Sequence, residues 1–223
     1  MIAGLADKKR TGQIIASADK LLHTEIGYQL LAPTYLIPDN NIGRISYLEP
    51  GICENGTVYS HVNSWMVLAL LRAGMPDKAY QIMQEITPGY TLLENEIKQI
   101  HPPYIFANGY YGSEHRNNKY QMEFTWITGS VAWHYNNVVK EMIGIQPEYS
   151  GLRIDPKIPA SWENVSAERT FRGKQFTINI QRKQGIKKME LELNGQHYDN
   201  SIIDIYHCTD SNYLKVFIPV TNS

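Results

Sequence analysis

Three residues of this chain have the types and the local sequence of an oxyanion-binding site: His61, Thr128 and Gly129. Thr128 and Gly129 stand where a loop enters an expected helix, so the first N–H groups of that helix lie beside the Thr hydroxyl, at the positive end of the helix dipole. His61 stands at the start of a second expected helix, which is nearly all apolar. Taken alone, each residue more often has a structural role, Thr128 as a helix N-cap and His61 as a hydrogen-bonded histidine.

Carboxylates on the loops offer a second kind of chemistry. Glu54, Glu114 and Glu123 are the acidic residues that a hydrolytic site could use. Inverting hydrolysis would require two of them to face one cleft. Glu54 also fits a carboxylate that pairs with a nearby Arg or Lys. We expect the run 114–116 to be a polar loop, with a place at the entrance of a cleft as the alternative.

The remaining histidines and tryptophans indicate no particular chemistry. Metal-ligand spacing with acids or cysteines is absent around three histidines, so we expect no metal; these are His101, His115 and His134. Aromatic side chains fill cores more often than they bind sugars. We therefore expect core positions for three tryptophans, namely Trp65, Trp126 and Trp133.

The composition excludes several classes of partner. The chain has 223 residues, of which 43% are hydrophobic, and a formal net charge of −1, so it has no electrostatic case for binding nucleic acid or an anionic membrane. No apolar run approaches the length of a membrane span. Cys53 and Cys208 are far apart in the sequence, which favours a reducing compartment over a disulfide framework. We therefore expect a soluble, globular, cytoplasmic protein.

The elements that position the candidate residues fall into two regimes. Up to about residue 150 the spacing of apolar residues predicts helices over residues 7–23, 61–73, 76–86 and 130–143. Long loops, over residues 24–60 and 88–125, separate them, and such loops inside compact domains tend to be functional. Paired helices fit an α/α barrel, and a plain bundle fits the same period.

The second regime, residues 151–223, has β character. Short strand-like runs alternate with turn signals such as Arg172-Gly173-Lys174 and Asn194-Gly195. This spacing predicts an antiparallel β-sandwich or jelly roll. The sequence thus predicts two domains, 1–150 and 151–223. The expected strands cover residues 152–154, 168–171, 175–182, 188–193, 201–206 and 213–220.

Several motifs follow one another in an order that is specific to one family. The segment 50–56 (PGICENG) precedes His61 and Trp65, and the segment 126–130 (WITGS) follows later. The segment 143–156 (IGIQPEYSGLRIDP) then enters the predicted sheet. Together these motifs resemble the C-terminal part of the inverting phosphorylases of glycoside hydrolase family 94, which include cellobiose and chitobiose phosphorylases. The C-terminal region of cyclic β-1,2-glucan synthases is similar. The resemblance covers essentially the whole chain.

The resemblance implies a fold and a set of site residues. It implies that residues 1–150 are the C-terminal portion of an (α/α)6 catalytic barrel, followed by a C-terminal jelly roll. His61, Thr128 and Gly129 match the family's phosphate ligands, and Glu54 matches an acidic sugar-binding residue. Asn108 stands where many members have a sugar-binding Gln. No cofactor is implied, because inorganic phosphate is the co-substrate.

The resemblance also implies a reaction. In the family, phosphate attacks the anomeric carbon of a β-linked glucoside while an Asp protonates the leaving oxygen, which yields α-sugar-1-phosphate. That Asp lies in a segment upstream of the residues matched here. We therefore expect a fragment or split subunit that carries the phosphate site, lacks the general acid, and depends on an upstream partner protein.

Two features leave the function open in part. Cys53 stands where cellobiose phosphorylases carry a Lys that contacts the acceptor sugar, which puts cellobiose itself in doubt and makes a β-1,2-linked oligoglucoside equally plausible. A non-catalytic carbohydrate-binding protein that uses the predicted jelly roll is an alternative function, and a helical-barrel hydrolase is another. Phosphate dependence separates the phosphorylase from the hydrolase.

Overall fold

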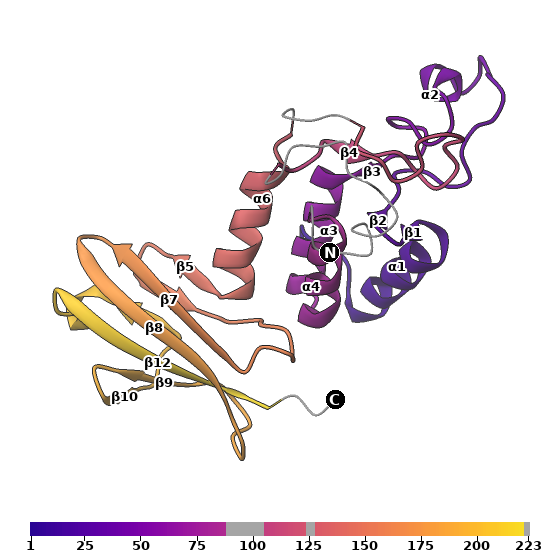
Figure 1. Ribbon diagram of the computed structural model, residues 1–223. Coiled ribbons are helices and arrows are strands. Elements are labelled where there is room, and N and C mark those ends of the chain that lie inside the picture. The colour runs from indigo at the N-terminus through magenta and orange to yellow at the C-terminus, as the bar shows by residue number, and fades with distance from the viewer. Residues whose placement is uncertain (88–104, 124–127, 221–223) are drawn as a thin grey trace. The chain divides into compact units, whose positions relative to one another are not determined.

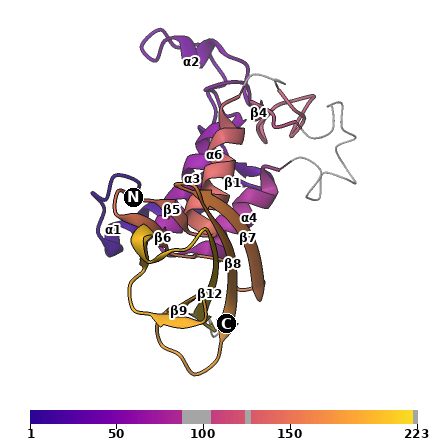
Figure 2. The same cartoon turned by 90° about the vertical axis from the view of Figure 1, so that its left-hand side faces the viewer.

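The computed structural model describes residues 1–87, 105–123 and 128–220. Its contacts divide the chain into an N-terminal unit, Met1–Asn137, and a C-terminal unit, Val138–Ser223 (Figures 1 and 2). The division falls before the predicted change near residue 150, because the segment that leads into the first strands already belongs to the second unit. Within the described residues, no helix is long and apolar enough to cross a bilayer.

Helix α1 (Lys8–Leu21) opens the N-terminal unit, within the range that the sequence predicts. The Asp7 carboxylate accepts a hydrogen bond from the Arg10 N–H and caps the helix. The apolar stripe of α1 is only partly covered: Ile15 is buried, whereas Ile14 and Leu21 are 42% and 60% exposed. Amphipathic spacing therefore predicted the helix correctly but overstated its burial.

Helices α3 (Ser60–Arg72) and α4 (Pro76–Glu85) form the expected antiparallel hairpin. Gly74 follows α3, and Pro76 occupies the first turn of α4, where its missing N–H breaks no helical bond. The interface is apolar, with Leu70, Leu71 and Ile82 fully buried. The loops of the unit contact this hairpin through α3.

The long loop between α1 and α3 contains regular structure. It holds β1 (His23–Thr24), β2 (Gly27–Tyr28), the short helix α2 (Arg44–Tyr47) and β3 (Val58–Tyr59). Strand β3 pairs antiparallel with β4 (Gly109–Tyr110), which lies far away in the sequence. The loops have an apolar core of their own, formed by Ile26, Val58, Ala107, Tyr110 and Tyr120. Both views show α2 at the outer end of its loop (Figures 1 and 2).

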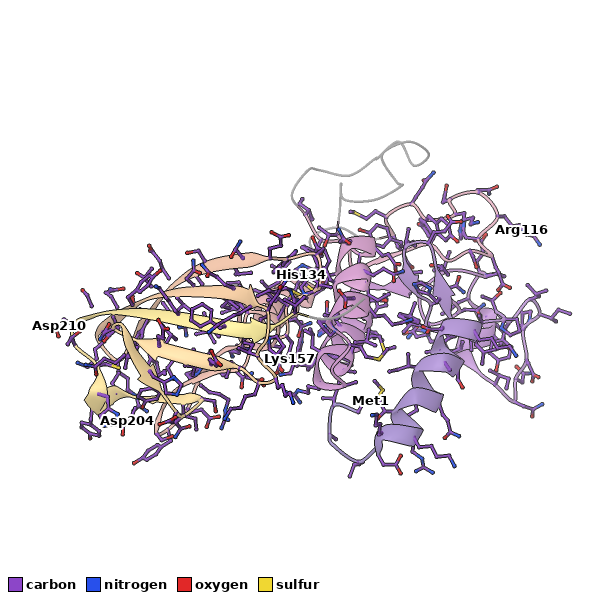
Figure 3. The ribbon with its side chains drawn as sticks, turned by 90° about the horizontal axis from the view of Figure 1, so that it is seen from below. Met1, Arg116, His134, Lys157, Asp204 and Asp210 are labelled. Carbon is purple, nitrogen blue, oxygen red and sulfur yellow. The ribbon has the colours of Figure 1, made fainter. Side chains whose placement is uncertain are left out.

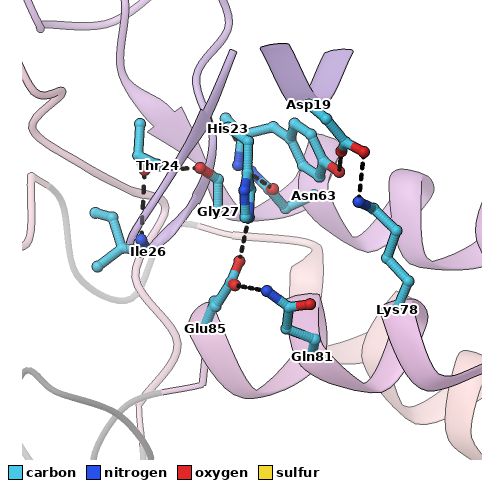
Figure 4. Close-up of polar contacts among 10 residues, drawn as sticks. Asp19, His23, Thr24, Ile26, Gly27, Asn63, Lys78, Gln81 and Glu85 are labelled. Carbon is cyan, nitrogen blue, oxygen red and sulfur yellow. Dashed lines mark hydrogen bonds and ion pairs between the residues drawn. The ribbon is translucent and has the colours of Figure 1, made fainter. Parts of the chain in front are cut away.

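A polar network joins α1 and the β1–β2 turn to the helical hairpin (Figure 4). Asp19 accepts hydrogen bonds from Lys78 Nζ at 2.6 Å and from the Tyr28 hydroxyl at 2.5 Å. Burial raises the pKa of Asp19, but these two hydrogen bonds and the charges of Lys78 and His23 together outweigh it and hold the pKa below its usual value. His23 Nε2 lies 2.9 Å from Glu85 Oε2. The network therefore anchors the first helix through charged contacts.

Helix α6 (Ser130–Asn136) continues directly into a π-helical turn, η1 (Asn137–Met142). The predicted helix over 130–143 is thus confirmed, with its last turn wider than expected. Asn137 Nδ2 donates to the Ser64 carbonyl at 2.7 Å, so α6 is joined to α3 by a buried side chain. This contact places the end of α6 beside Ser64 of α3.

The C-terminal unit contains two sheets. The larger has the strand order β10-β9-β12-β8-β7 and the smaller has the order β11-β6-β5. The strands are β5 (Ile145–Pro147), β6 (Gly151–Ile154), β7 (Asn164–Phe171), β8 (Lys174–Lys183), β9 (Glu190–Leu193), β10 (Gln196–Tyr198), β11 (Ile202–Asp204) and β12 (Ser211–Pro219), and a 3-10 turn, η2 (Ile205–His207), follows β11.

The sheets confirm most of the β prediction and correct one part of it. Pairing is antiparallel as expected, except that β12 pairs parallel to β8. The sequence did not predict β5 and β10, which are three residues long each. Alternate residues of β8 and β12 face the core, including Phe176, Ile178 and Val216. Asp204 ends β11, and Asp210 stands on the bend before β12 (Figure 3).

Candidate functional site

The segment 50–57 forms a tight turn that leads through β3 into α3. The Asn55 N–H donates to the Ile52 carbonyl and the Thr57 N–H to the Cys53 carbonyl, both at 3.0 Å. Cys53 has a φ of 47°, in the left-handed region that a non-glycine residue rarely adopts. Glu54 follows it and is exposed. The turn therefore presents the Glu54 carboxylate to solvent from a strained but well-bonded backbone.

Asn55 holds the turn against the preceding loop. Its side chain is fully buried. Oδ1 accepts from the Tyr35 N–H at 2.8 Å, and Nδ2 donates to the carbonyls of Tyr35 and Leu48 at 3.0 and 2.8 Å. Asn55 therefore shapes the turn.

Glu123 holds the same turn from the other side. Its Oε1 accepts from the Cys53 N–H at 3.0 Å and from the Cys53 thiol at 3.3 Å, while its Oε2 lies 2.6 Å from the Thr57 hydroxyl. Burial, together with the hydrogen bond and the charge of Glu123, raises the pKa of Cys53 to about 11. The thiol is therefore a neutral hydrogen-bond donor at physiological pH.

Asn108 lies beside the start of α3. Its carbonyl accepts from the Ser60 N–H at 3.0 Å, and the neighbouring Gly109 pairs with Tyr59. Asn108 Oδ1 and Ser60 Oγ are buried and have no hydrogen-bond partner among the described residues. Two polar atoms of this small region are thus left without a protein contact in the part of the chain that the structure describes.

His61 and Gly129 meet, although they are far apart in the sequence. A Cβ atom on Gly129 would lie 3.0 Å from His61 Cε1, so the absence of a side chain lets the imidazole approach the backbone. His61 Nε2 is buried and lacks a hydrogen-bond partner among the described residues. A buried imidazole nitrogen without a partner costs free energy unless a ligand or water satisfies it.

Thr128 completes this group. Its Oγ1 accepts from the Ser130 N–H at 3.0 Å and lies 2.8 Å from Ser130 Oγ. When the Ser130 hydroxyl donates to Thr128, the Thr128 proton is available to a ligand. Sequence analysis did not single out Ser130, although it belongs to the same motif and is fully buried. The structure thus brings His61, Thr128 and Gly129 together.

Two tryptophans flank His61, contrary to the expectation of core positions. Trp65 and Trp133 are 41% and 37% exposed. Their ring centroids lie 4.9 and 6.2 Å from the imidazole and 5.9 Å from each other. Among the described residues, neither ring is therefore part of a core. Trp126 lies outside the described residues, and so does His101.

The other carboxylates do not form a hydrolytic pair. Glu114 Oε2 accepts from the Thr34 N–H at 2.8 Å, so it holds a loop. The run 114–116 is a polar loop, as expected, but His115 within it is only 6% exposed and accepts from the Asn118 N–H through Nδ1. The neighbouring Arg116 is exposed (Figure 3). His134, also labelled there, is largely buried, which lowers its pKa.

The chain matches a known protein family. A family model described as "Glycosyl hydrolase 94 superfamily, catalytic domain" matches residues 1–144. The matched region contains every candidate site residue: Glu54, His61, Asn108, Thr128 and Gly129.

Characterised relatives agree with this match. The chain is 31% identical to a solabiose phosphorylase of Paenibacillus borealis, over 86% of this chain and 25% of that protein. It is 30% identical to an N,N'-diacetylchitobiose phosphorylase of Vibrio proteolyticus, over 87% and 24%. It is 27% identical to a cellobionic acid phosphorylase of Neurospora crassa, over 82% and 23%. The chain thus spans about a quarter of the length of these relatives.

Proposed function

The chain belongs to the glycosyl hydrolase 94 superfamily, and from this premise we propose that it carries the phosphate-binding part of an inverting β-glucoside phosphorylase. The observation that carries the proposal is the contact between His61 and Gly129 beside the Thr128 hydroxyl. An imidazole N–H and a hydroxyl held close to each other suit a phosphate oxyanion. The buried Nε2 of His61, which has no hydrogen-bond partner in the described part of the chain, supports this role. Inorganic phosphate is the co-substrate, and no cofactor is needed.

The reaction follows from an anionic nucleophile. A phosphate oxygen forms a bond to the anomeric carbon with inversion, the glycosidic carbon–oxygen bond breaks, and an acid protonates the leaving oxygen. The products are α-glucose-1-phosphate and a shortened sugar. Phosphate is already ionised at neutral pH, so the base that an inverting hydrolase uses to activate water is not required. His61 and Thr128 orient the phosphate for attack. Their hydrogen bonds also offset the repulsion between the phosphate charge and the carboxylates of the site.

The acid is proposed to come from outside these residues, on upstream sequence or on a separate polypeptide. The described carboxylates near the site have other tasks: Glu123 accepts hydrogen bonds from Cys53 and Thr57, and Glu114 holds Thr34. Residues 1–150 would then complete an (α/α)6 barrel together with that partner, and residues 151–223 would form the jelly roll that follows the barrel.

The sugar is proposed to lie over the 53–57 turn. Glu54 is exposed there, and Asn108 has a buried amide oxygen without a partner among the described residues. The Cys53 thiol is held by Glu123 and is shorter than the Lys of cellobiose phosphorylases. A β-1,2-linked oligoglucoside is therefore as plausible a substrate as cellobiose. The three relatives named above are phosphorylases of different disaccharides.

The first experiment measures phosphate binding to the chain by calorimetry. A hydrogen bond to a charged group contributes about 1.5–3 kcal/mol, so His61→Ala should weaken phosphate binding by about ten- to a hundredfold. Gly129→Ala should also weaken it, because the new Cβ displaces the imidazole. His197→Ala is the matched control, since His197 is an exposed histidine of the C-terminal unit. Equal binding by all variants would refute the site.

The second experiment measures release of glucose-1-phosphate from a panel of β-linked glucobioses, with and without the upstream polypeptide. Phosphate-dependent release only with that polypeptide is the expected result, and the panel identifies the linkage. Release by the chain alone would show that one of its own carboxylates is the acid. Phosphate-independent cleavage would indicate a hydrolase, and sugar binding without turnover an accessory protein.

A further inference from the structure

We propose that Glu123 is a positioning residue that fixes the sugar-binding turn by accepting hydrogen bonds from both of its ends. The inference rests on the proposed function for the role of Glu54, but the contacts themselves do not depend on it. One carboxylate oxygen accepts from the Cys53 backbone and thiol, and the other lies 2.6 Å from the Thr57 hydroxyl. Glu54 stands between these two contact points.

The position of Glu123 is itself well defined. The Glu123 N–H donates to the Gly109 carbonyl at 2.9 Å, and Met122 forms a bridge with Tyr110. Gly109 leaves room for the carboxylate: a Cβ there would lie 2.9 Å from Thr57 Oγ1 and 3.6 Å from Glu123 Oε2. Glu123 thus connects the strand that follows Asn108 to the turn that carries Glu54, so it joins the two proposed sugar-binding residues.

The turn needs such a partner. Cys53 has a φ of 47°, a conformation that costs a non-glycine residue free energy and persists where its surroundings hold it. Its N–H points at Glu123 rather than at a backbone carbonyl. Without the carboxylate, this N–H would lose its acceptor and the residue could relax to a negative φ. Glu54, the next residue, would then turn away from its present direction.

The phosphate residues are held independently of Glu123. Pairing of β3 with β4 and the hydrogen bond from the Ser60 N–H to the Asn108 carbonyl fix the start of α3. Gly129 and Thr128 reach His61 from a different helix. Loss of Glu123 should therefore weaken sugar binding and leave phosphate binding unchanged, a separation that general loss of structure would not produce.

Glutamine should rescue the geometry. In Glu123→Gln the amide oxygen can still accept from the Cys53 N–H. The amide N–H₂ can donate to Thr57 Oγ1, whose own proton then goes to the Tyr110 carbonyl, 2.8 Å away. Alanine offers neither contact. The two variants thus separate the loss of the hydrogen bonds from the loss of the charge.

The first test uses the Cys53 thiol as a reporter, in the full chain with Cys208→Ser so that Cys53 is the one thiol. Iodoacetamide alkylation is followed from pH 7 to pH 10. Glu123→Gln removes a negative charge next to the thiol and so lowers the pKa of the thiol. A fall of about one pKa unit raises the thiolate fraction near pH 8 by about tenfold. Because a less basic thiolate is also less nucleophilic, we expect alkylation to become about three- to fivefold faster. Glu114→Gln, on the same loop but bonded to Thr34, is the control and should leave the rate unchanged. Equal rates in the parent and in Glu123→Gln would overturn the proposal.

The second test measures binding of cellobiose, sophorose and inorganic phosphate to the same chain by NMR titration. We expect Glu123→Ala to weaken sugar binding about tenfold with phosphate binding unchanged, and Glu123→Gln to stay within about twofold of the parent for both. If Glu123→Ala does not fold, Thr57→Val removes one of the contacts at constant shape and should weaken sugar binding in the same sense. Unchanged sugar binding in these variants would refute positioning, while the proposed function would stand. A parent chain that binds neither sugar nor phosphate would refute the proposed function. The alkylation test would still decide whether Glu123 contacts Cys53.

Discussion

The two units of this chain differ in how many polar side chains they bury. Buried polar side chains of the described residues lie almost entirely in the N-terminal unit, and Asn212 is the one such residue in the C-terminal unit. The C-terminal interior is otherwise apolar and includes alternating residues of β8, β9 and β12. In the N-terminal unit, Asn55, Asn63 and Glu123 bond to backbone groups of distant loops.

This difference shows where the sequence is constrained by chemistry. An apolar core tolerates many substitutions, because different apolar residues of similar volume can fill it. A buried amide or carboxylate is useful only where its partners stand in one arrangement, so it fixes loops that have little apolar surface. Every candidate site residue lies on loops and helix starts of this kind. The polar interior therefore positions the site, whereas the apolar interior stabilises a β-sheet unit.

The largest expected effect tests the apolar interior. Phe176 is 1% exposed in the centre of β8. Phe176→Ala should lower the free energy of unfolding by about 3–5 kcal/mol, because it removes apolar contacts and leaves a cavity. Denaturant unfolding followed by circular dichroism measures the change. Phe176→Leu is the matched control and should cost much less; a similar loss for both would show that the ring itself is required rather than the filled volume.

The next effect tests the polar interior. Asn55→Ala leaves the Tyr35 N–H and the carbonyls of Tyr35 and Leu48 without their partner. Buried groups without partners cost about 1–3 kcal/mol each, partly relieved by water, so we expect a loss of about 2–3 kcal/mol in denaturant unfolding. Asn41→Ala, at an exposed position of the same loop, should change little. A negligible effect of Asn55→Ala would remove the distinction between the two interiors.

The same distinction explains what the sequence could predict. Helices α3 and α4 and strands β8 and β12 follow from periodic apolar residues and from local signals such as Pro76. The proposed phosphate residues were selected because they match the motif of the family, since their position at helix starts alone favours a structural role. The contacts of Glu123 with Cys53 and Thr57 could not be predicted, because they join segments about 70 residues apart that show no periodicity. The parallel pairing of β12 with β8 was missed for a similar reason: strand direction depends on the sheet order, not on the local pattern.

A smaller effect tests the charged contacts that anchor α1. Lys78→Met removes the partner of Asp19 while keeping most of the apolar stem, and should lower the free energy of unfolding by about 1 kcal/mol, since the pair is partly exposed. The folded pKa of Asp19 lies below its unfolded value, so the stabilisation is present above the unfolded pKa and is lost as the pH falls through the folded one. Thermal unfolding at pH 7 and pH 3 should therefore show a difference between parent and variant that is smaller at pH 3. Lys157→Met, which removes an exposed pair in the C-terminal unit, is the control.

The smallest effect concerns His134, on the helix that follows the Thr128 turn. Burial lowers its pKa below the usual 6.5, so the unfolded chain takes up a proton as the pH falls through 6.5 while the folded chain does not. The free energy of unfolding therefore decreases as the pH is lowered. The decrease between pH 7 and pH 6 is at most about 0.7 kcal/mol for this one group. His134→Gln should remove this part of the pH dependence, measured as the difference between the two unfolding profiles, and His197→Gln, an exposed histidine of the other unit, is the control. An unchanged profile in His134→Gln would mean that the helix opens enough to hydrate the imidazole in the folded state. The polar interior of the N-terminal unit would then be less rigid than the apolar interior of the C-terminal unit.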